Sequence, residues 1–389
     1  MTRIALAVGL FLLAPLMGEY LIGNIPATHL PGLIVLAPMY GGAALLIREV
    51  TRRTRRGWPT LLTLATAYGL LQPAVIDQSL FNPSFDGHDF TAAPTHLPAL
   101  GLDPGLLLTF TAGHAITTLA VPIALIEALA RHRADQPWLR TPGLIVTTLL
   151  FAAGSWLIYD DHQRTFQASP TQLTISALVV MALTAAAFTF RPGGGRNDRT
   201  GESRGPAAAK HLRPSAPNPS TNSAPSTAPS TAPSVDSGVD SGVDRSVSRS
   251  VDPGVSPAPD PAPCPAPSPA TSLALSLGAR PAPRPWQVAV AVFALDTAET
   301  LRPETWPGLI AGAGILAGAA LVITRWAARP GWSRRHITCL AAGAALTPMW
   351  TGFLLLHLTG NATPANLTGQ ALVAATALAV VTAAVRAAR

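Results

Sequence analysis

The chain has 389 residues, of which 48% are hydrophobic and only 12% are charged, whereas soluble domains contain about 25% charged residues. The formal net charge of +7 does not indicate a nucleic-acid partner, because the arginines fall between apolar stretches rather than in one basic patch. Cys264 and Cys339 are the only cysteines, so a disulfide framework and a cysteine-based metal centre are excluded. The composition therefore favours an integral membrane protein without a cofactor.

Ten apolar stretches follow one another along the chain, and most approach the roughly 20 residues that cross the hydrocarbon core of a bilayer. They cover residues 4–23, 31–48, 59–80, 105–129, 142–159, 171–190, 286–301, 307–326, 336–358 and 369–386. This pattern predicts an all-α fold, a polytopic transmembrane helical bundle of about ten membrane helices. The stretch 286–301 is the weakest, because as a helix it extends only about 24 Å and contains Asp296 and Glu299.

The arginines between these stretches fall on alternate sides of the membrane. With a cytoplasmic N-terminus, the inner loops contain Arg52, Arg53, Arg55, Arg56, Arg131, Arg133, Arg140, Arg325, Arg329, Arg334 and Arg335. The outer loops contain Arg164 and Arg302. Because cytoplasmic loops collect Lys and Arg, the charge pattern predicts a multi-pass protein of the inner (plasma) membrane with both termini in the cytoplasm. The bilayer is then its first partner.

Residues 191–284 have a different composition, dominated by Pro, Ser, Ala, Gly and Asp with short imperfect repeats. Such a segment has too little apolar surface to offset the entropy of the chain. It predicts a disordered cytoplasmic linker between membrane helices 1–6 in residues 1–190 and membrane helices 7–10 in residues 285–389. The linker is either a docking segment or a spacer without a binding role.

Polar side chains inside predicted helices require an explanation, because a charge near the bilayer centre costs roughly 2.5–3.5 kcal/mol. In the first four predicted helices and at their ends these are Glu19, Tyr20, Asn24, Tyr40, Gln72, Asp77, Gln78 and His114. The topology places them between mid-membrane and the outer surface, so they predict one outward-facing polar pocket. Interhelical hydrogen bonds that stabilise the bundle explain the same residues equally well. Near the cytoplasmic ends of the helices, Glu49, Glu127 and His336 are expected to lie at the membrane interface.

Several phrases of the sequence resemble a group of actinobacterial multi-pass membrane proteins that have no assigned function. They are GEYLIGN (18–24), LAPMYGGAALLIREV (36–50), GWPTLL (57–62), AYGLLQ (67–72), QSLFNP (78–83) and VPIALIEAL (121–129). Together they lie within about a quarter of the chain. The resemblance implies a membrane location.

A fainter resemblance is to the CAAX-protease and bacteriocin-processing (CPBP) family of intramembrane proteases. FTAGH (110–114) and HLTGN (357–361) match two of that family's motifs, Phe-xxx-His and His-xxx-Asn. Its Glu-Glu-xxx-Arg motif is replaced by Gln72-Pro73 and Asp77, and a glutamine cannot take a proton from water. The resemblance therefore implies a degenerate hydrolase, and we predict neither catalytic residues nor a metal ligand.

Three classes of function fit these observations. The first is a non-catalytic membrane protein that acts as a scaffold, a sensor or the partner of another membrane or cytoplasmic protein. The second is a transporter of a small solute or a lipid, whose polar groups line an outward cavity and whose prolines serve as hinges. The third is the degenerate CPBP-like hydrolase. A nucleotide-binding loop is missing from the sequence, so the chain has no ATPase domain of its own.

Overall fold

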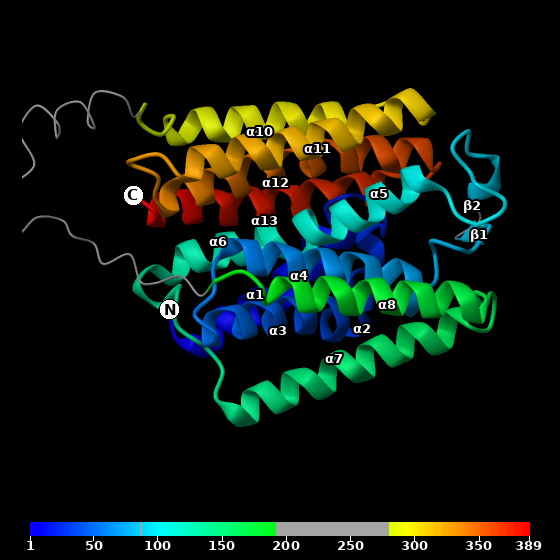
Figure 1. The fold of residues 1–389 in the computed structure, drawn as a ribbon, viewed down its shortest axis with the longest axis horizontal. Coiled ribbons are helices and arrows are strands. Elements are labelled where there is room, and N and C mark those ends of the chain that lie inside the picture. The colour runs from blue at the N-terminus through cyan, green and yellow to red at the C-terminus, as the bar shows by residue number, and fades with distance from the viewer. Residues whose placement is uncertain (86–87, 192–279) are drawn as a thin grey trace, which may run out of the picture. The chain divides into compact units, whose positions relative to one another are not determined.

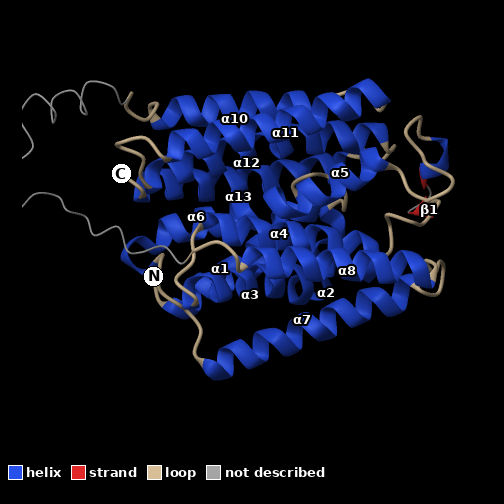
Figure 2. Cartoon of the chain, viewed as in Figure 1, coloured by secondary structure: helices blue, strands red, loops and turns tan. Residues whose placement is uncertain are grey.

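A computed structural model of the chain describes residues 1–85, 88–191 and 280–389. In these ranges the protein is a bundle of helices, and its one sheet is the antiparallel pair β1 (Ser84–Phe85) and β2 (His88–Asp89) (Figures 1 and 2). The predicted all-α fold is confirmed. Most of the predicted linker, 191–284, lies outside the described residues.

The helices follow one another with short connections, and many begin with a proline in the first turn, where its missing N–H group is not needed. Their bounds are α1 (Arg3–Pro15), α2 (Leu33–Leu36), α3 (Gly42–Arg53), α4 (Trp58–Leu71), α5 (Pro104–Gly113), α6 (Val121–Ala130), α7 (Thr141–His162), α8 (Pro170–Ala187), α10 (Pro285–Thr300), α11 (Trp306–Ala327), α12 (Arg334–Leu358) and α13 (Pro364–Ala387). Four π-helical segments continue or precede them: η1 (Leu16–Tyr20), η3 (Ala37–Gly41), η4 (Gln72–Ile76) and η6 (His114–Ala120). The short 3₁₀ turns are η2 (Ala27–Gly32), η5 (Phe90–Ala92) and η7 (Arg131–Arg133).

Nine helical stretches of the described residues are long and apolar enough to cross a membrane. They are Arg3–Tyr20, Ala27–Arg53, Trp58–Ile76, Pro104–Arg133, Thr141–His162, Pro170–Ala187, Trp306–Ala327, Arg334–Leu358 and Pro364–Ala387. Each corresponds to one of the ten predicted spans. The tenth prediction, 286–301, is a helix of 16 residues, α10, which packs along α12 (Figure 1) but is shorter than a typical span.

The helices divide into central and peripheral ones. In the apolar windows of α1, α4 and α12, 56%, 61% and 56% of the residues are buried, whereas the share in α7, α8 and α11 is 11% each. α7, α8 and α11 therefore expose apolar side chains over most of their surface, as helices that face lipid do. The buried core lies among α1, η3, α4, α6, α12 and α13.

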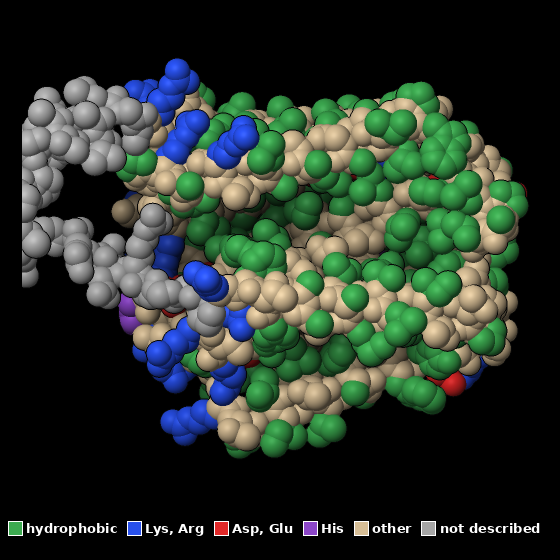
Figure 3. Space-filling view, in the orientation of Figure 1, with side chains coloured by type: hydrophobic (Ala, Val, Ile, Leu, Met, Phe, Trp, Pro, Cys, Tyr) green, Lys and Arg blue, Asp and Glu red, His purple; other side chains and the backbone are tan. Residues whose placement is uncertain are grey.

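Basic side chains gather at one end of the helices. Figure 3 shows Lys and Arg at the end of the bundle where Figure 1 places both termini.

Candidate functional site

The four π-helical segments are the most unusual local feature of the described chain. A π-helical turn is rare, occurs mostly as a single-turn bulge and is frequently found at functional sites. Pro15 directly precedes η1, Pro38 lies in η3, Pro73 lies in η4, and Pro122 follows two residues after η6. A proline lacks the backbone donor and clashes with the carbonyl four residues earlier, so each of these segments lies in or next to a place where the regular helical hydrogen bonding is interrupted.

The same four segments carry polar residues that the sequence singles out. Glu19 belongs to η1, Tyr40 to η3, Gln72 to η4 and His114 to η6. Two of the segments pack directly against each other, since η1 contacts η6, and η6 also packs against α4. Gly18 permits this approach, because a Cβ atom at that position would lie 2.7 Å from Cγ2 of Thr118.

The Tyr40 hydroxyl is the centre of a buried hydrogen-bond network. It accepts a hydrogen bond from Nε2 of Gln72 at 3.1 Å and lies 3.5 Å from Nε2 of His114. The Glu19 carboxylate also hydrogen-bonds to Tyr40. The rings of Tyr40 and His114 stack with their centroids 5.8 Å apart. Because Nδ1 of His114 lies 2.7 Å from the Phe110 carbonyl, which only accepts, the neutral imidazole carries its proton on Nδ1 and offers Nε2 as an acceptor.

Two further residues extend the network at its ends. Nδ2 of Asn24 donates to Oε2 of Glu19 at 2.7 Å, and Nε2 of Gln72 donates to Oδ2 of Asp77 at 2.6 Å. Oδ1 of Asp77 accepts from the Ser79 amide at 2.9 Å. Glu19, Gln72 and Asp77 are all buried. The structure thus joins six of the predicted pocket residues in one chain of contacts.

The other two predicted residues lie elsewhere. The Tyr20 hydroxyl donates to the carbonyl of His29 at 3.0 Å. Oε1 of Gln78 accepts from the amide of Ala168 at 2.6 Å. Both side chains are buried and form hydrogen bonds with backbone groups of loops. Neither joins the contacts around Tyr40.

A cavity of about 510 Å³ lies beside this network. Glu19, Asn24 and His114 line it from the first part of the chain, together with other residues of α5 and η6, and α10, α11 and α12 of the last part also contribute to the wall. Asp296 and Glu299 add two carboxylates from α10. Figure 3 shows the molecular surface hollowed between the layer of α10 and α11 and the layer of α4 and α8. The sequence did not predict that α10 and α12 would line this cavity. Asp296 and Glu299 did mark the predicted helix 286–301 as unusual for a membrane span.

The residues of the protease-like motifs do not assemble. Phe110 and His114 both line the cavity, but His357 is exposed and its Nδ1 contacts the Phe353 carbonyl of its own helix. Glu19 and His114 both contact Tyr40, which links them. In the described ranges no group of three or more His, Cys, Asp or Glu side chains is placed to hold a metal ion.

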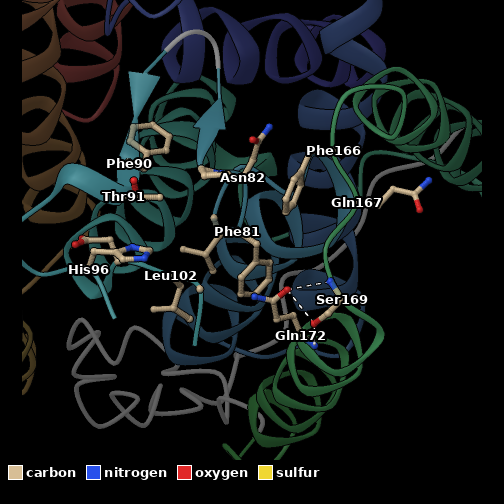
Figure 4. Close-up of a pocket in the computed structure, with 14 residues that line it drawn as sticks. Phe81, Asn82, Phe90, Thr91, His96, Leu102, Phe166, Gln167, Ser169 and Gln172 are labelled. Carbon is tan, nitrogen blue, oxygen red and sulfur yellow. Dashed lines mark hydrogen bonds between the residues drawn. The ribbon is translucent and has the colours of Figure 1, made fainter. Parts of the chain in front are cut away.

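A second cavity, of about 380 Å³, lies among the loops at the opposite end of the helices from the termini. Phe81, Phe90 and Phe166 contribute aromatic rings to it (Figure 4). Gln172 also lines it, accepting from the Ser169 amide at 2.9 Å. Loop residues contribute much of the lining of this cavity, and no pattern in the sequence indicated it.

An ion-pair cluster closes the end of the bundle where the arginines gather. Arg48 is fully buried and contacts the carboxylates of Glu49 at 2.8 Å and Glu127 at 3.1 Å. Its guanidinium lies 3.3 Å from the ring centroid of Trp138. Glu49, Glu127 and His336 are 0%, 7% and 5% exposed, so they are buried within the protein, and their location at the membrane interface stays a prediction. The sequence did not reveal that arginines would pair with Glu49 and Glu127 inside the protein, or that His336 would contact Ser333 and the Pro283 carbonyl.

Comparison with known proteins agrees with the fold. Residues 9–198 match the model of a family described as an uncharacterized membrane protein family. No curated protein and no solved structure matches the chain. With nine helices suited to crossing a membrane among the residues that the structure describes, this match identifies a multi-pass membrane protein in contact with the lipid bilayer, and the family description names no activity.

Proposed function

We propose that the protein binds a small solute or a lipid within the membrane, in the cavity beside Tyr40, and acts as a carrier for it. The observation that supports this proposal is the cavity of about 510 Å³ formed by helices from both parts of the chain. Its volume lies within the roughly 300–1,000 Å³ of typical ligand pockets. Apolar walls with a few polar groups are also the usual composition of such pockets.

The polar groups support the carrier proposal further. Ionisable residues in membrane segments are rare, face the bundle interior and mark substrate or ion pathways. Transporter sites lie between parts of the bundle and are typically built on interrupted helices. Glu19 and His114 combine these properties, because both lie in π-helical segments and both line the cavity.

The orientation of the protein is part of the proposal. We place it in the plasma membrane with both termini in the cytoplasm, because its basic side chains gather at that end. The network around Tyr40 then lies deeper in the membrane than the loops that contain the second cavity. The degenerate-hydrolase alternative gains nothing from the geometry, since Gln72 donates hydrogen bonds to Tyr40 and Asp77 and offers no base.

The test is the accessibility of the cavity to a small thiol reagent. In a chain with Cys264 and Cys339 replaced by serine, Thr351→Cys introduces a thiol on the cavity wall. Ala345→Cys is the matched control, because Ala345 lies on the same helix, is fully buried and does not line the cavity. We expect a membrane-impermeant reagent added to whole cells to modify Thr351→Cys and to leave Ala345→Cys unmodified.

If neither position reacts in the folded protein with impermeant or permeant reagents, the cavity is closed to solutes and the carrier proposal fails. The buried polar network would then serve only to stabilise the packing of the helices. A scaffold or partner protein would become the better interpretation.

A further inference from the structure

The charges on the cavity wall specify the kind of ligand, and we infer that the cavity binds an amphipathic organic cation, an apolar body that carries an ammonium group. This inference rests on the proposed function and deepens it. It is carried by the sign of the side chains on the wall and by the apolar surface around them.

The charged residues on the wall are acidic. Glu19, Asp296 and Glu299 line the cavity, and none of the described lining residues is a lysine or an arginine. Glu299 is neutralised by Arg302, whose Nε lies 3.0 Å from Oε1 of the carboxylate. Asp296 instead takes a hydrogen bond from the hydroxyl of Thr347. The Thr347 hydroxyl brings no positive charge, so within the described lining Asp296 is not paired with a lysine or an arginine, and the wall offers a negative site.

The remaining wall suits an apolar body. Leu316, Leu354 and Leu355 face the cavity from α11 and α12, and Ile116 faces it from η6. Phe110 adds an aromatic ring, whose face attracts a cation within about 6 Å. Apolar surroundings lower the local dielectric constant and strengthen the attraction between a carboxylate and an ammonium group.

The same arrangement discriminates against other ligands. An anion of equal size would meet like charge from Asp296, and such contacts cost several kcal/mol at buried sites. A neutral alcohol would bury the same apolar surface without the ionic contribution. The cavity therefore ranks an alkylammonium ion above an alcohol of equal length and the alcohol above a carboxylate.

The experiment uses the full chain, purified in a non-ionic detergent, with Thr351→Cys as the reporter and both native cysteines replaced by serine. The probes are octyltrimethylammonium, octanol and octanoate, each below its micelle-forming concentration. Alkylation of the reporter is timed at increasing probe concentration. We expect octyltrimethylammonium to protect the thiol at a concentration at least about tenfold below that of octanoate, because one unfavourable charge contact is worth a tenfold difference or more.

Asp296→Asn removes the charge and should reduce this preference by about tenfold, whereas Asp296→Glu should retain it and shows that the position tolerates substitution. Asp160→Asn is the control, since Asp160 is an exposed acid paired with Arg164 outside the cavity, and it should leave the preference unchanged.

The outcomes separate the two proposals. If Thr351→Cys reacts but the three probes protect it equally, or if Asp296→Asn keeps the preference, the cationic ligand is refuted while the cavity stands. If Thr351→Cys reacts in neither cells nor detergent, the cavity itself fails and both proposals fall.

Discussion

Replacing Glu127 with glutamine tests how the arginine-rich end of the bundle is stabilised. Oε1 of Glu127 accepts from Nε of Arg48 at 3.1 Å and from Nε of Arg52 at 2.7 Å, and its Oε2 accepts from Nη2 of Arg52 at 2.6 Å. All three side chains are less than a tenth exposed. The substitution keeps the size of the side chain but removes its charge and turns one acceptor into a donor that faces guanidinium groups.

The expected loss of unfolding free energy depends on which contacts Arg48 and Arg52 keep after the substitution. Removing one partner of a buried ion pair costs about 3–5 kcal/mol. Arg48 keeps Glu49 at 2.8 Å and donates through Nη2 to the carbonyls of Ala134 and Gln136 at 2.6 and 2.9 Å. Arg52 keeps one long hydrogen bond, to the Arg56 carbonyl at 3.5 Å, and the ring of Trp58 with its centroid 5.9 Å from Cζ. Because Arg48 remains largely compensated, we expect a loss at the lower end, about 3 kcal/mol.

The free energy of unfolding is measured by titrating the purified protein in mixed micelles with a denaturing detergent. Asp160→Asn is the matched control, because it breaks the pair of Asp160 with Arg164, whose side chains are 48% and 71% exposed, and such a pair contributes about 0.3–0.5 kcal/mol. The reasoning is refuted if Glu127→Gln unfolds at the same point as this control. That result would mean that the buried arginines rehydrate or find other acceptors at little cost.

Further predictions use pairs of like substitutions in the same assay. Gly41→Ala should cost about 1–3 kcal/mol, since its Cβ would overlap the Phe11 carbonyl, whereas Gly314→Ala, with open space at that position, should be neutral or stabilise by up to about 1 kcal/mol. Tyr40→Phe should cost about 1 kcal/mol, because it removes a hydrogen-bonded hydroxyl. Tyr68→Phe should cost about zero, because that buried hydroxyl has no partner among the described residues. Equal losses of unfolding free energy in the two glycine variants would contradict the close packing at Gly41. Equal losses in the two tyrosine variants would contradict the hydrogen-bond network around Tyr40.

Hydrophobicity and length were sufficient to predict the membrane helices. The predicted span 142–159 corresponds to α7 (Thr141–His162), and 171–190 corresponds to α8 (Pro170–Ala187). A long apolar run has few alternatives to a helix in a bilayer, because every backbone polar group must be satisfied internally. The same argument fails for α10, whose length is marginal and whose packing on α12 depends on residues far away in the sequence.

The candidate site was predictable only in part. The sequence indicates the depth of a residue along its membrane helix, but it does not indicate which helices pack against one another. Glu19, Tyr40 and His114 were expected between mid-membrane and the outer surface, and the structure joins them. That Asp296 lines the same cavity as His114 depends on how the last helices pack against the first. The burial of Glu127 was missed for a related reason, because its partner Arg48 lies on another helix.

The π-helical segments explain why the face of the helix on which a polar residue lies was harder to predict than its depth in the membrane. One extra residue in a turn rotates all following side chains by about 100° relative to an α-helix. Glu19 and Tyr20 are neighbours in η1, and yet only Glu19 belongs to the network, while Tyr20 bonds to the loop carbonyl of His29. A 3.6-residue period cannot assign faces across such a turn.

A proline close to polar residues is the feature of the sequence that accompanies this site. Each of the four π-helical segments combines a nearby proline with polar residues in an apolar run. The proline leaves one carbonyl without its helical partner, and the widened turn places side chains where a regular helix would not. Polar residues there contact one another rather than lipid, as Gln72 and Tyr40 do. Each π-helical segment of this network therefore has a proline in it or close to it, although Pro348 in α12 shows that a proline alone does not produce such a turn.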